Sequence, residues 1–183
     1  GNRRLSQSLN SYNISMPILD ANTFEFISRS ADQTRRIGSR LGEILKRADV
    51  IGLTGDLGAG KTAFARALLA ALGHRGRVKS PTFTLLEPYN FPRFDLYHFD
   101  FYRFSSSDEW REAGFDEYFT GAAVTLVEWP EMGGPGLPAP DLRIRLEFDP
   151  DAEGVRHARL EARGPRGLAC LRAARAAGFS GSA

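Results

Sequence analysis

The first half of the chain alternates between apolar spacings typical of strands and of helices. Thr23–Ser28 alternates apolar and polar residues, which predicts a strand. Apolar residues then recur on one helical face up to about Arg47, and the Ser30–Gln33 pair at the start of this segment has the spacing of a capping box. The short apolar run 49–54 predicts a buried strand, and the Ala- and Leu-rich segment 61–72 predicts the next helix.

The second half begins with a polar, proline-bearing stretch and continues with strand-like runs. Residues 78–86 predict a loop that passes into a strand. Residues 96–104 are rich in aromatic side chains and predict a strand with Asp100 near its middle. One or two short helices are expected over 105–119, and the β-branched run 122–127 predicts another buried strand.

The C-terminal part of the chain predicts a hairpin and a helix. Residues 142–148 and 156–162 each alternate cleanly on either side of a polar turn, as in two antiparallel strands, and 168–177 predicts a final helix. Together these elements predict an α/β fold in one domain over residues 21–180. We expect three layers, a mixed, mostly parallel central sheet and a C-terminal antiparallel hairpin.

One segment between a predicted strand and a predicted helix carries a chemical signature. Residues 55–62 read Gly-Asp-Leu-Gly-Ala-Gly-Lys-Thr, which fits the phosphate-binding loop pattern. Its glycines allow backbone N–H groups to point at phosphate oxygens, Lys61 adds a mobile positive charge, and Thr62 offers a hydroxyl to Mg²⁺. The following helix aims the positive end of its dipole at the anion. A glycine-rich turn that binds no ligand is the alternative reading.

Composition narrows the class of protein. The chain has 183 residues, with 42% apolar and 25% charged residues, and no apolar run approaches the length of a membrane span. Cys170 is the single cysteine, which excludes an intrachain disulfide; we expect no disulfide-linked partner and a cytoplasmic location. The net charge of +2 does not by itself imply nucleic-acid binding. Residues 1–20 lack the apolar core of a secretory signal and are interpreted as a disordered extension or, in part, a cloning remnant.

Nucleotide chemistry needs a carboxylate near the phosphate loop, and two residues are candidates. Glu128 follows a buried strand, the usual setting of an acid that holds Mg²⁺; a solvated acid at a strand end is the alternative. Asp100 lies in the aromatic strand, where a structural pair with Arg103 or His98 is the alternative. We interpret His98 as structural. Trp129, beside Glu128, could border the site or belong to the core.

The kind of nucleotide protein can be narrowed by absent motifs. The sequence contains no Asn-Lys-x-Asp, and its only Asp-x-x-Gly, at 151–154, lies in the hairpin turn, far from where a GTPase switch belongs. The chain between the phosphate loop and Glu128 leaves little room for the Arg-rich lid and acceptor pocket of a nucleotide kinase. ATP is therefore the expected nucleotide.

Four motifs in order carry a family resemblance. They are residues 55–62, Lys-Ser-Pro-Thr-Phe-Thr-Leu at 79–85, His-Phe-Asp-Phe-Tyr-Arg at 98–103 and Leu-Val-Glu-Trp-Pro at 126–130. Together they resemble the TsaE family, also called YjeE, over a range from about Thr23 to the final helix. The resemblance implies a small ATPase of tRNA threonylcarbamoyladenosine biosynthesis. It would bind ATP and Mg²⁺, hydrolyse ATP slowly and act with a TsaB–TsaD complex, which modifies adenosine 37; contact with tRNA would be indirect, and no membrane would be involved.

The resemblance also implies roles for individual residues. Lys61, Thr82, Asp100 and Glu128 would serve catalysis, with Thr82 in a switch-like loop near the γ-phosphate and Asp100 positioning the attacking water. Thr62 and Glu128 would hold Mg²⁺. The remaining nucleotide-binding positions would be Asp56, Leu57, Gly58, Ala59, Gly60, Ala63 and Trp129, with Ala31, Gly154 and Arg156 bordering the base.

Two other functions stay open at this stage. A small-molecule kinase would pass the γ-phosphate to an acceptor hydroxyl and would have to exclude water. A nucleotide-binding switch without useful hydrolysis would keep its function when Glu128 or Asp100 is replaced. The C-terminal arginines Arg163, Arg166, Arg172 and Arg175 form either a solvated basic face or, less favoured, a surface for a partner or tRNA.

Overall fold

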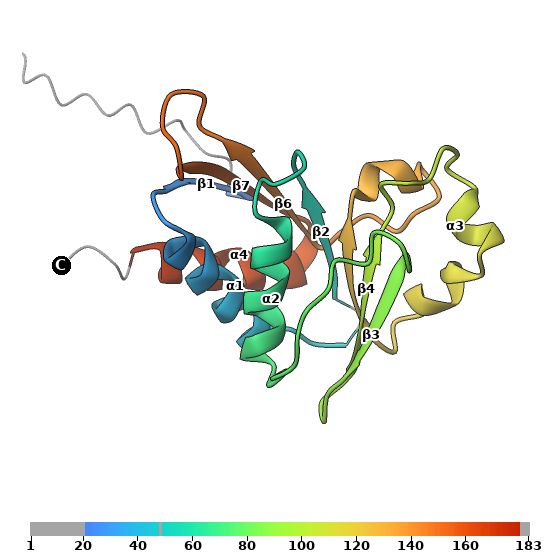
Figure 1. Ribbon diagram of the computed structural model, residues 1–183. Coiled ribbons are helices and arrows are strands. Elements are labelled where there is room, and N and C mark those ends of the chain that lie inside the picture. The colour runs from blue at the N-terminus through green and yellow to red at the C-terminus, as the bar shows by residue number, and fades with distance from the viewer. Residues whose placement is uncertain (1–20, 48, 180–183) are drawn as a thin grey trace, which may run out of the picture.

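The computed structural model describes residues 21–47 and 49–179, so the interpretation of residues 1–20 lies outside the described residues. Strands and helices follow the predicted order (Figure 1). The strands are β1 (Thr23–Ser28), β2 (Val50–Thr54), β3 (Leu86–Asn90), β4 (Asp95–Asp100), β5 (Val124–Glu128), β6 (Leu142–Phe148) and β7 (Arg156–Ala162). The helices are α1 (Ala31–Ile44), α2 (Lys61–Ala71), α3 (Glu109–Glu112) and α4 (Gly164–Phe179), and the 3₁₀ helices are η1 (Phe115–Phe119) and η2 (Pro130–Gly133).

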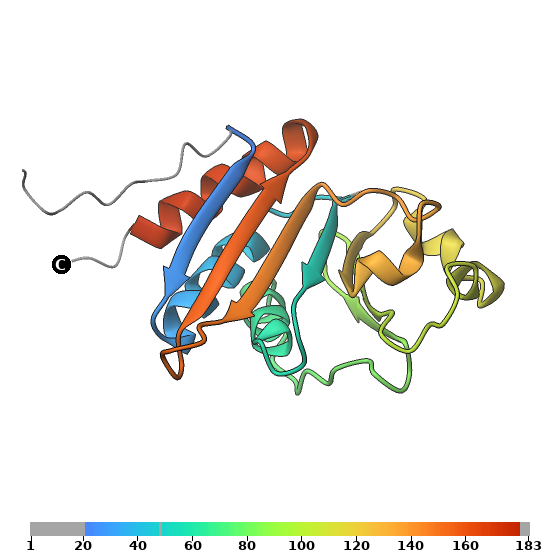
Figure 2. The same ribbon diagram turned by 90° about the horizontal axis from the view of Figure 1, so that it is seen from above.

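The seven strands form one mixed sheet in the order β1-β7-β6-β2-β5-β4-β3 (Figure 2). The central pairs β6–β2, β2–β5 and β5–β4 are parallel, whereas the outer pairs β1–β7, β6–β7 and β3–β4 are antiparallel. The predicted hairpin is confirmed with its boundaries as β6 and β7. Because the central strands are parallel, their C-terminal ends meet at one edge of the sheet, where sites form in α/β folds.

Helices α1, α2 and α4 cover one face of the sheet, and α3, η1 and η2 lie against the other face beside β4 and β5 (Figures 1 and 2). The face with the three long helices holds the larger core, which includes Leu96 of β4 and Leu126 of β5. The opposite faces of the same strands hold a second, aromatic core around Phe99 and Trp110. Strands β4 and β5 therefore contribute side chains to both cores.

Helices α1 and α2 pack so closely that glycine is required between them. A Cβ on Gly42 would lie 2.6 Å from the carbonyl oxygen of Leu68, and one on Gly38 would lie 3.0 Å from that of Phe64. The contact moves from Phe64 to Leu68 as α1 advances from Gly38 to Gly42, so the two helices run in the same direction. Both N-termini lie toward the C-terminal edge of the parallel strands.

None of the helices within the described ranges is long and apolar enough to cross a membrane.

Several predicted boundaries are wrong, and side-chain contacts account for two of them. Strand β4 ends at Asp100 instead of 104, because the Asp100 carboxylate accepts the Tyr102 N–H at 2.9 Å and turns the chain. Helix α1 ends at Ile44 instead of about 47, where the buried Asp49 carboxylate accepts the Lys46 N–H at 2.7 Å. Helix α4 is longer at both ends than the predicted 168–177.

Candidate nucleotide-binding site

The predicted site residues on β2, β4 and β5 meet at the C-terminal edge of the parallel strands. Glu128 is the last residue of β5, and it is paired in register with Asp100, the last residue of β4, and with Leu53 of β2. Both acids lie on the sheet face covered by α2, because they continue the rows begun by Leu126 and Leu96. The fold thus brings two carboxylates, separated by 28 positions in sequence, beside the loop that follows β2.

The loop at 55–60 joins β2 to α2 with three glycines at positive φ. The values are 147° at Gly55, 80° at Gly58 and 106° at Gly60. Gly55 is also sterically required, since a Cβ there would lie 2.2 Å from the carbonyl oxygen of Leu146 in β6. These are the conformations that turn backbone N–H groups inward in a phosphate-binding loop.

Lys61 lies folded back onto this loop. Its Nζ donates hydrogen bonds to the carbonyl oxygens of Gly55 and, at 2.8 Å, Asp56, and it lies 4.9 Å from the centre of the Trp129 ring. The side chain is 6% exposed. Burial lowers the pKa of the Lys61 ammonium, while the neighbouring carboxylates, Glu128 first and then Asp100, act to raise it.

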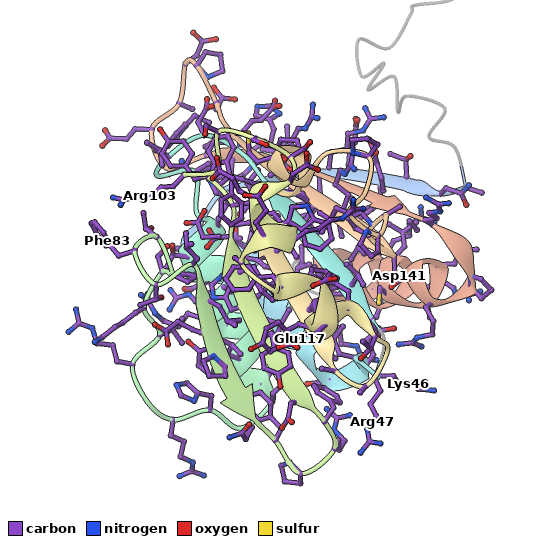
Figure 3. The ribbon with its side chains drawn as sticks, turned by 90° about the vertical axis from the view of Figure 1, so that its right-hand side faces the viewer. Lys46, Arg47, Phe83, Arg103, Glu117 and Asp141 are labelled. Atoms are coloured by element: carbon purple, nitrogen blue, oxygen red, sulfur yellow. The ribbon has the colours of Figure 1, made fainter. Side chains whose placement is uncertain are left out.

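Asp100 is linked to the predicted switch loop. Its Oδ2 accepts a hydrogen bond from Thr82 Oγ1 at 3.3 Å, and Thr82 Oγ1 is in turn 3.0 Å from Ser80 Oγ. Burial raises the pKa of the Asp100 carboxyl, with the Tyr102 N–H opposing the shift. Among the described residues, the Asp100 carboxylate is hydrogen-bonded to Thr82 and Tyr102 and not to Arg103 or His98, so the alternative of a structural pair with either of these is wrong. Arg103 instead lies over the exposed ring of Phe83 at 4.2 Å, and both project from the surface (Figure 3).

Glu128 has a buried partner that the sequence did not reveal. Its Oε2 is 3.0 Å from His98 Nε2, and the two side chains are 3% and 0% exposed. The alternative of a solvated strand-end acid for Glu128 is therefore wrong. His98 and Glu128 are 30 positions apart, and only the parallel pairing of β4 with β5 brings them together.

Trp129 follows Glu128 directly and has a left-handed backbone, with φ at 57°. Its N–H donates to the carbonyl oxygen of Leu53 at 3.0 Å, which fixes the chain after β5 to the end of β2. The indole ring packs against Tyr102 with ring centres 5.0 Å apart, and Lys61 lies over it. Trp129 thus contacts the site and also packs against the aromatic core.

The start of β7 borders the phosphate loop through Arg156. Its Nε donates to the carbonyl oxygen of Ala59 at 3.2 Å, and its guanidinium lies 4.3 Å from the ring centre of Phe148, a contact that sequence reasoning missed. Gly154 is exposed in the hairpin turn, where a Cβ would meet no atom within 4 Å. Ala31 is exposed at the start of α1. The roles of Gly154 and Ala31 at the base stay predictions.

The residues expected to hold Mg²⁺ fit a phosphate-bound ion. Thr62 lies in the first turn of α2, and Glu128 supplies a carboxylate oxygen at the strand edge. Within the described ranges, no group of three or more His, Cys, Asp or Glu side chains could hold a metal by itself. This donor set suits Mg²⁺, which usually takes only one or two protein oxygens and completes its shell with phosphate and water.

The strand, glycine-rich loop and helix, with acids at the ends of neighbouring parallel strands, define a P-loop NTPase-like α/β fold. The structure superimposes on the crystal structure of Bacillus subtilis YdiB with a TM-score of 0.69 and 30% identity, covering 84% of this chain and 95% of that one. Residues 28–158 match the family described as "Threonylcarbamoyl adenosine biosynthesis protein TsaE". The chain belongs to the TsaE family.

Relatives of known name support the assignment. The chain is 40% identical over 125 residues to the tRNA threonylcarbamoyladenosine biosynthesis protein TsaE of Haemophilus influenzae, covering 66% of this chain and 79% of the relative. It is 41% identical over 122 residues to the protein of the same name from Bacillus subtilis, covering 67% and 76%. These matches confirm the resemblance drawn from the four motifs.

Proposed function

We propose that this protein binds and slowly hydrolyses ATP as an accessory ATPase of tRNA threonylcarbamoyladenosine biosynthesis. The observation that carries the proposal is the placement of the Lys61 ammonium and the Glu128 and Asp100 carboxylates around one phosphate loop. The pathway follows from membership of the TsaE family and from the names of its relatives.

Lys61 is the residue that must change its contacts when nucleotide binds. In this structure its ammonium is satisfied by two loop carbonyl oxygens. Phosphate oxygens would replace these acceptors, since they carry full negative charge and charge-assisted hydrogen bonds are the stronger ones. The loop N–H groups and the N-terminus of α2 add to the attraction.

The carboxylates around Lys61 argue for a divalent cation. Glu128, Asp100, Asp56 and Glu131 all act on its charge. A triphosphate entering among these acids would be repelled unless a cation screened it, and Thr62 with Glu128 would hold Mg²⁺ there. When bound, Mg²⁺ neutralises phosphate charge that develops during transfer.

Asp100 and Thr82 are proposed to act on water and on the γ-phosphate. Burial raises the pKa of Asp100, which favours a carboxyl group able to take up a proton from an attacking water. Thr82 now donates its hydroxyl to Asp100. A move of Thr82 toward the γ-phosphate would free the carboxylate, which couples the loop at 80–84 to the water-positioning acid.

Partner activation completes the proposal. A TsaB–TsaD-type complex is the expected partner, and tRNA would be reached through that complex. The competing hypothesis, a small-molecule kinase, needs an enclosed acceptor site. The charged cavity on α1, lined by Asp32, Arg35, Arg36, Arg40 and Glu43, includes no residue of the phosphate loop and neither Glu128 nor Asp100. It therefore offers no acceptor position beside the γ-phosphate, which favours hydrolysis.

The experiment is ADP release by the purified chain with Mg-ATP, alone and with TsaB and TsaD. Slow turnover that rises with the pair and collapses in Glu128→Ala and Lys61→Ala is the expected result. Exposed Glu117→Ala serves as the control and should behave as wild type. Turnover that ignores the pair, but rises with a metabolite that itself becomes phosphorylated, would replace this proposal with the kinase.

A further inference from the structure

We infer that His98 is a positioning residue that holds Glu128 in one orientation for Mg²⁺-dependent nucleotide binding. The inference rests on the proposed function and deepens it. Among the described residues, the side chain of His98 is hydrogen-bonded to Glu128 and not to the phosphate loop, so it acts through Glu128.

The pair is fully enclosed and well placed. His98 Nε2 and Glu128 Oε2 are 3.0 Å apart, and the side chains are 0% and 3% exposed. Both come from neighbouring parallel strands whose register is fixed on either side, with Asp100 beside Glu128 and Leu126 beside His98. A hydrogen bond between rigid strand positions loses little entropy when it forms and restricts the carboxylate strongly.

The second ring nitrogen of His98, Nδ1, shows which tautomer is present and that the buried imidazole costs free energy. Among the described residues His98 Nδ1 is buried and has no hydrogen-bond partner. An N–H at Nδ1 would therefore be an unsatisfied donor, so the proton belongs on Nε2, which donates to Glu128. A buried nitrogen without a partner costs free energy that leucine at this position would avoid. Packing alone does not account for histidine here.

The hydrogen bond from His98 occupies one carboxylate oxygen of Glu128 and leaves the other for a ligand. Oε2 accepts from His98, and Oε1 is left free among the described residues. Oε1 is then the oxygen that would serve the Mg²⁺ held with Thr62, and the Glu128 carboxylate already acts on the charge of the Lys61 ammonium. Partners that orient carboxylate ligands in this way contribute to metal affinity in proteins generally.

Isosteric variants separate positioning from packing. The amide nitrogen of His98→Gln can take the place of Nε2, that of His98→Asn takes the place of Nδ1, and His98→Leu has no donor. The readout is ADP affinity by titration calorimetry with Mg²⁺ and with EDTA, and Mg²⁺ titrations of kcat and KM accompany it. His157→Leu is the matched control, because His157 pairs with Asp149 in the hairpin, outside this pair.

We expect the strengthening of ADP binding by Mg²⁺ to fall about 10-fold to 100-fold in His98→Leu and His98→Asn, and to be retained in His98→Gln and His157→Leu. ADP affinity in EDTA should stay as in wild type for all four. Folded His98→Leu and His98→Asn proteins with the wild-type Mg²⁺ effect would overturn the inference. If His98→Gln loses as much of the Mg²⁺ effect and as much stability as His98→Leu, then His98 serves packing alone, and the inference is again overturned. Wild-type protein whose ADP binding ignores Mg²⁺ would instead contradict the proposed function, before any variant is compared.

Discussion

At the scale of single residues, Gly55 shows how tightly the phosphate loop is held against the sheet. Its φ of 147° and its approach to the Leu146 carbonyl oxygen exclude any side chain. We expect Gly55→Ala to lower the free energy of unfolding by about 3 kcal/mol and to abolish nucleotide binding. Urea unfolding and calorimetry measure both effects.

Gly58→Ala is the matched control for Gly55. It lies in the same loop with φ at 80°, but a Cβ there would meet only the Phe148 ring, at 3.6 Å. Its cost should be only the conformational one, about 1–2 kcal/mol. Equal losses in the two variants would show that the contact with Leu146 contributes nothing.

Asp100 is the residue whose charge the fold disfavours. Burial raises the pKa of its carboxyl, so the folded protein holds the proton to higher pH than the unfolded chain does. Its ionisation therefore lowers the stability of the wild type as pH rises from the unfolded pKa toward the folded one. Asp100→Asn avoids this cost and keeps an oxygen for the Tyr102 N–H.

The prediction for Asp100→Asn is a stability gain that depends on pH. Relative to wild type, the gain should be near zero at low pH, grow as pH rises through the acidic range and then level off, while ATP hydrolysis is lost. Urea unfolding from pH 4 to pH 7.5 measures it, with exposed Asp116→Asn as control. A stability gain that shrinks with rising pH would contradict a raised pKa for the Asp100 carboxyl.

At the scale of elements, one ion pair fixes the edge of the sheet opposite the site. Asp49, 1% exposed before β2, accepts hydrogen bonds at 3.0 and 2.8 Å from Arg166 of α4. Arg166 also donates to the carbonyl oxygen of Ile44 at the end of α1. This contact joins α1, β2 and α4, so Arg166 belongs to the structure and not to a free basic face.

Removal of Arg166 should leave a buried carboxylate without its partner. Arg166→Met is expected to cost about 1.5–3 kcal/mol, and less in an Asp49→Asn background, where no charge is left unpaired. Exposed Arg172→Met on the same helix should change stability by less than about 0.5 kcal/mol. Thermal unfolding of wild type, Arg166→Met, Asp49→Asn and the double variant gives the double-mutant cycle. Purely additive effects of the two substitutions would contradict the pairing.

The contacts that the sequence could not predict are those between distant segments. Local spacing located the loop at 55–62, the capping box at Ser30 and the hairpin of β6 and β7, because each depends on neighbours within a few positions. The His98–Glu128 and Asp49–Arg166 pairs join segments 30 and 117 positions apart. The early end of β4 was missed because an aromatic run gives no sign of the turn that Asp100 makes with Tyr102.

At the scale of the whole molecule, the site lies where two cores share β4 and β5. Helices α1, α2 and α4 pack on one face, and the aromatic core supports the other. A nucleotide bound as proposed would contact the loop, both strand ends and the start of β7 together. Nucleotide binding should therefore stabilise the molecule as one unit.

Thermal unfolding tests this coupling directly. Mg-ATP at about 100 times its dissociation constant should stabilise the fold by about 2.7 kcal/mol, which corresponds to a rise in Tm of roughly 5–10 °C. Lys61→Ala should show no rise at the same concentration. A wild-type Tm that is unchanged by saturating nucleotide would contradict binding to the folded state.

The position of Trp129 provides an internal optical probe. The chain has two tryptophans, and the other, Trp110, is 2% exposed in the aromatic core and donates to the Gly133 carbonyl oxygen at 2.9 Å. The Lys61 ammonium lies 4.9 Å from the Trp129 ring centre, so a phosphate that draws it away changes the electric field at that indole and leaves Trp110 in place. Emission of a Trp110→Phe protein should therefore shift in wavelength or intensity when nucleotide enters, whereas emission of Trp129→Phe should stay constant. The occupancy of the loop could then be followed in real time without any attached dye.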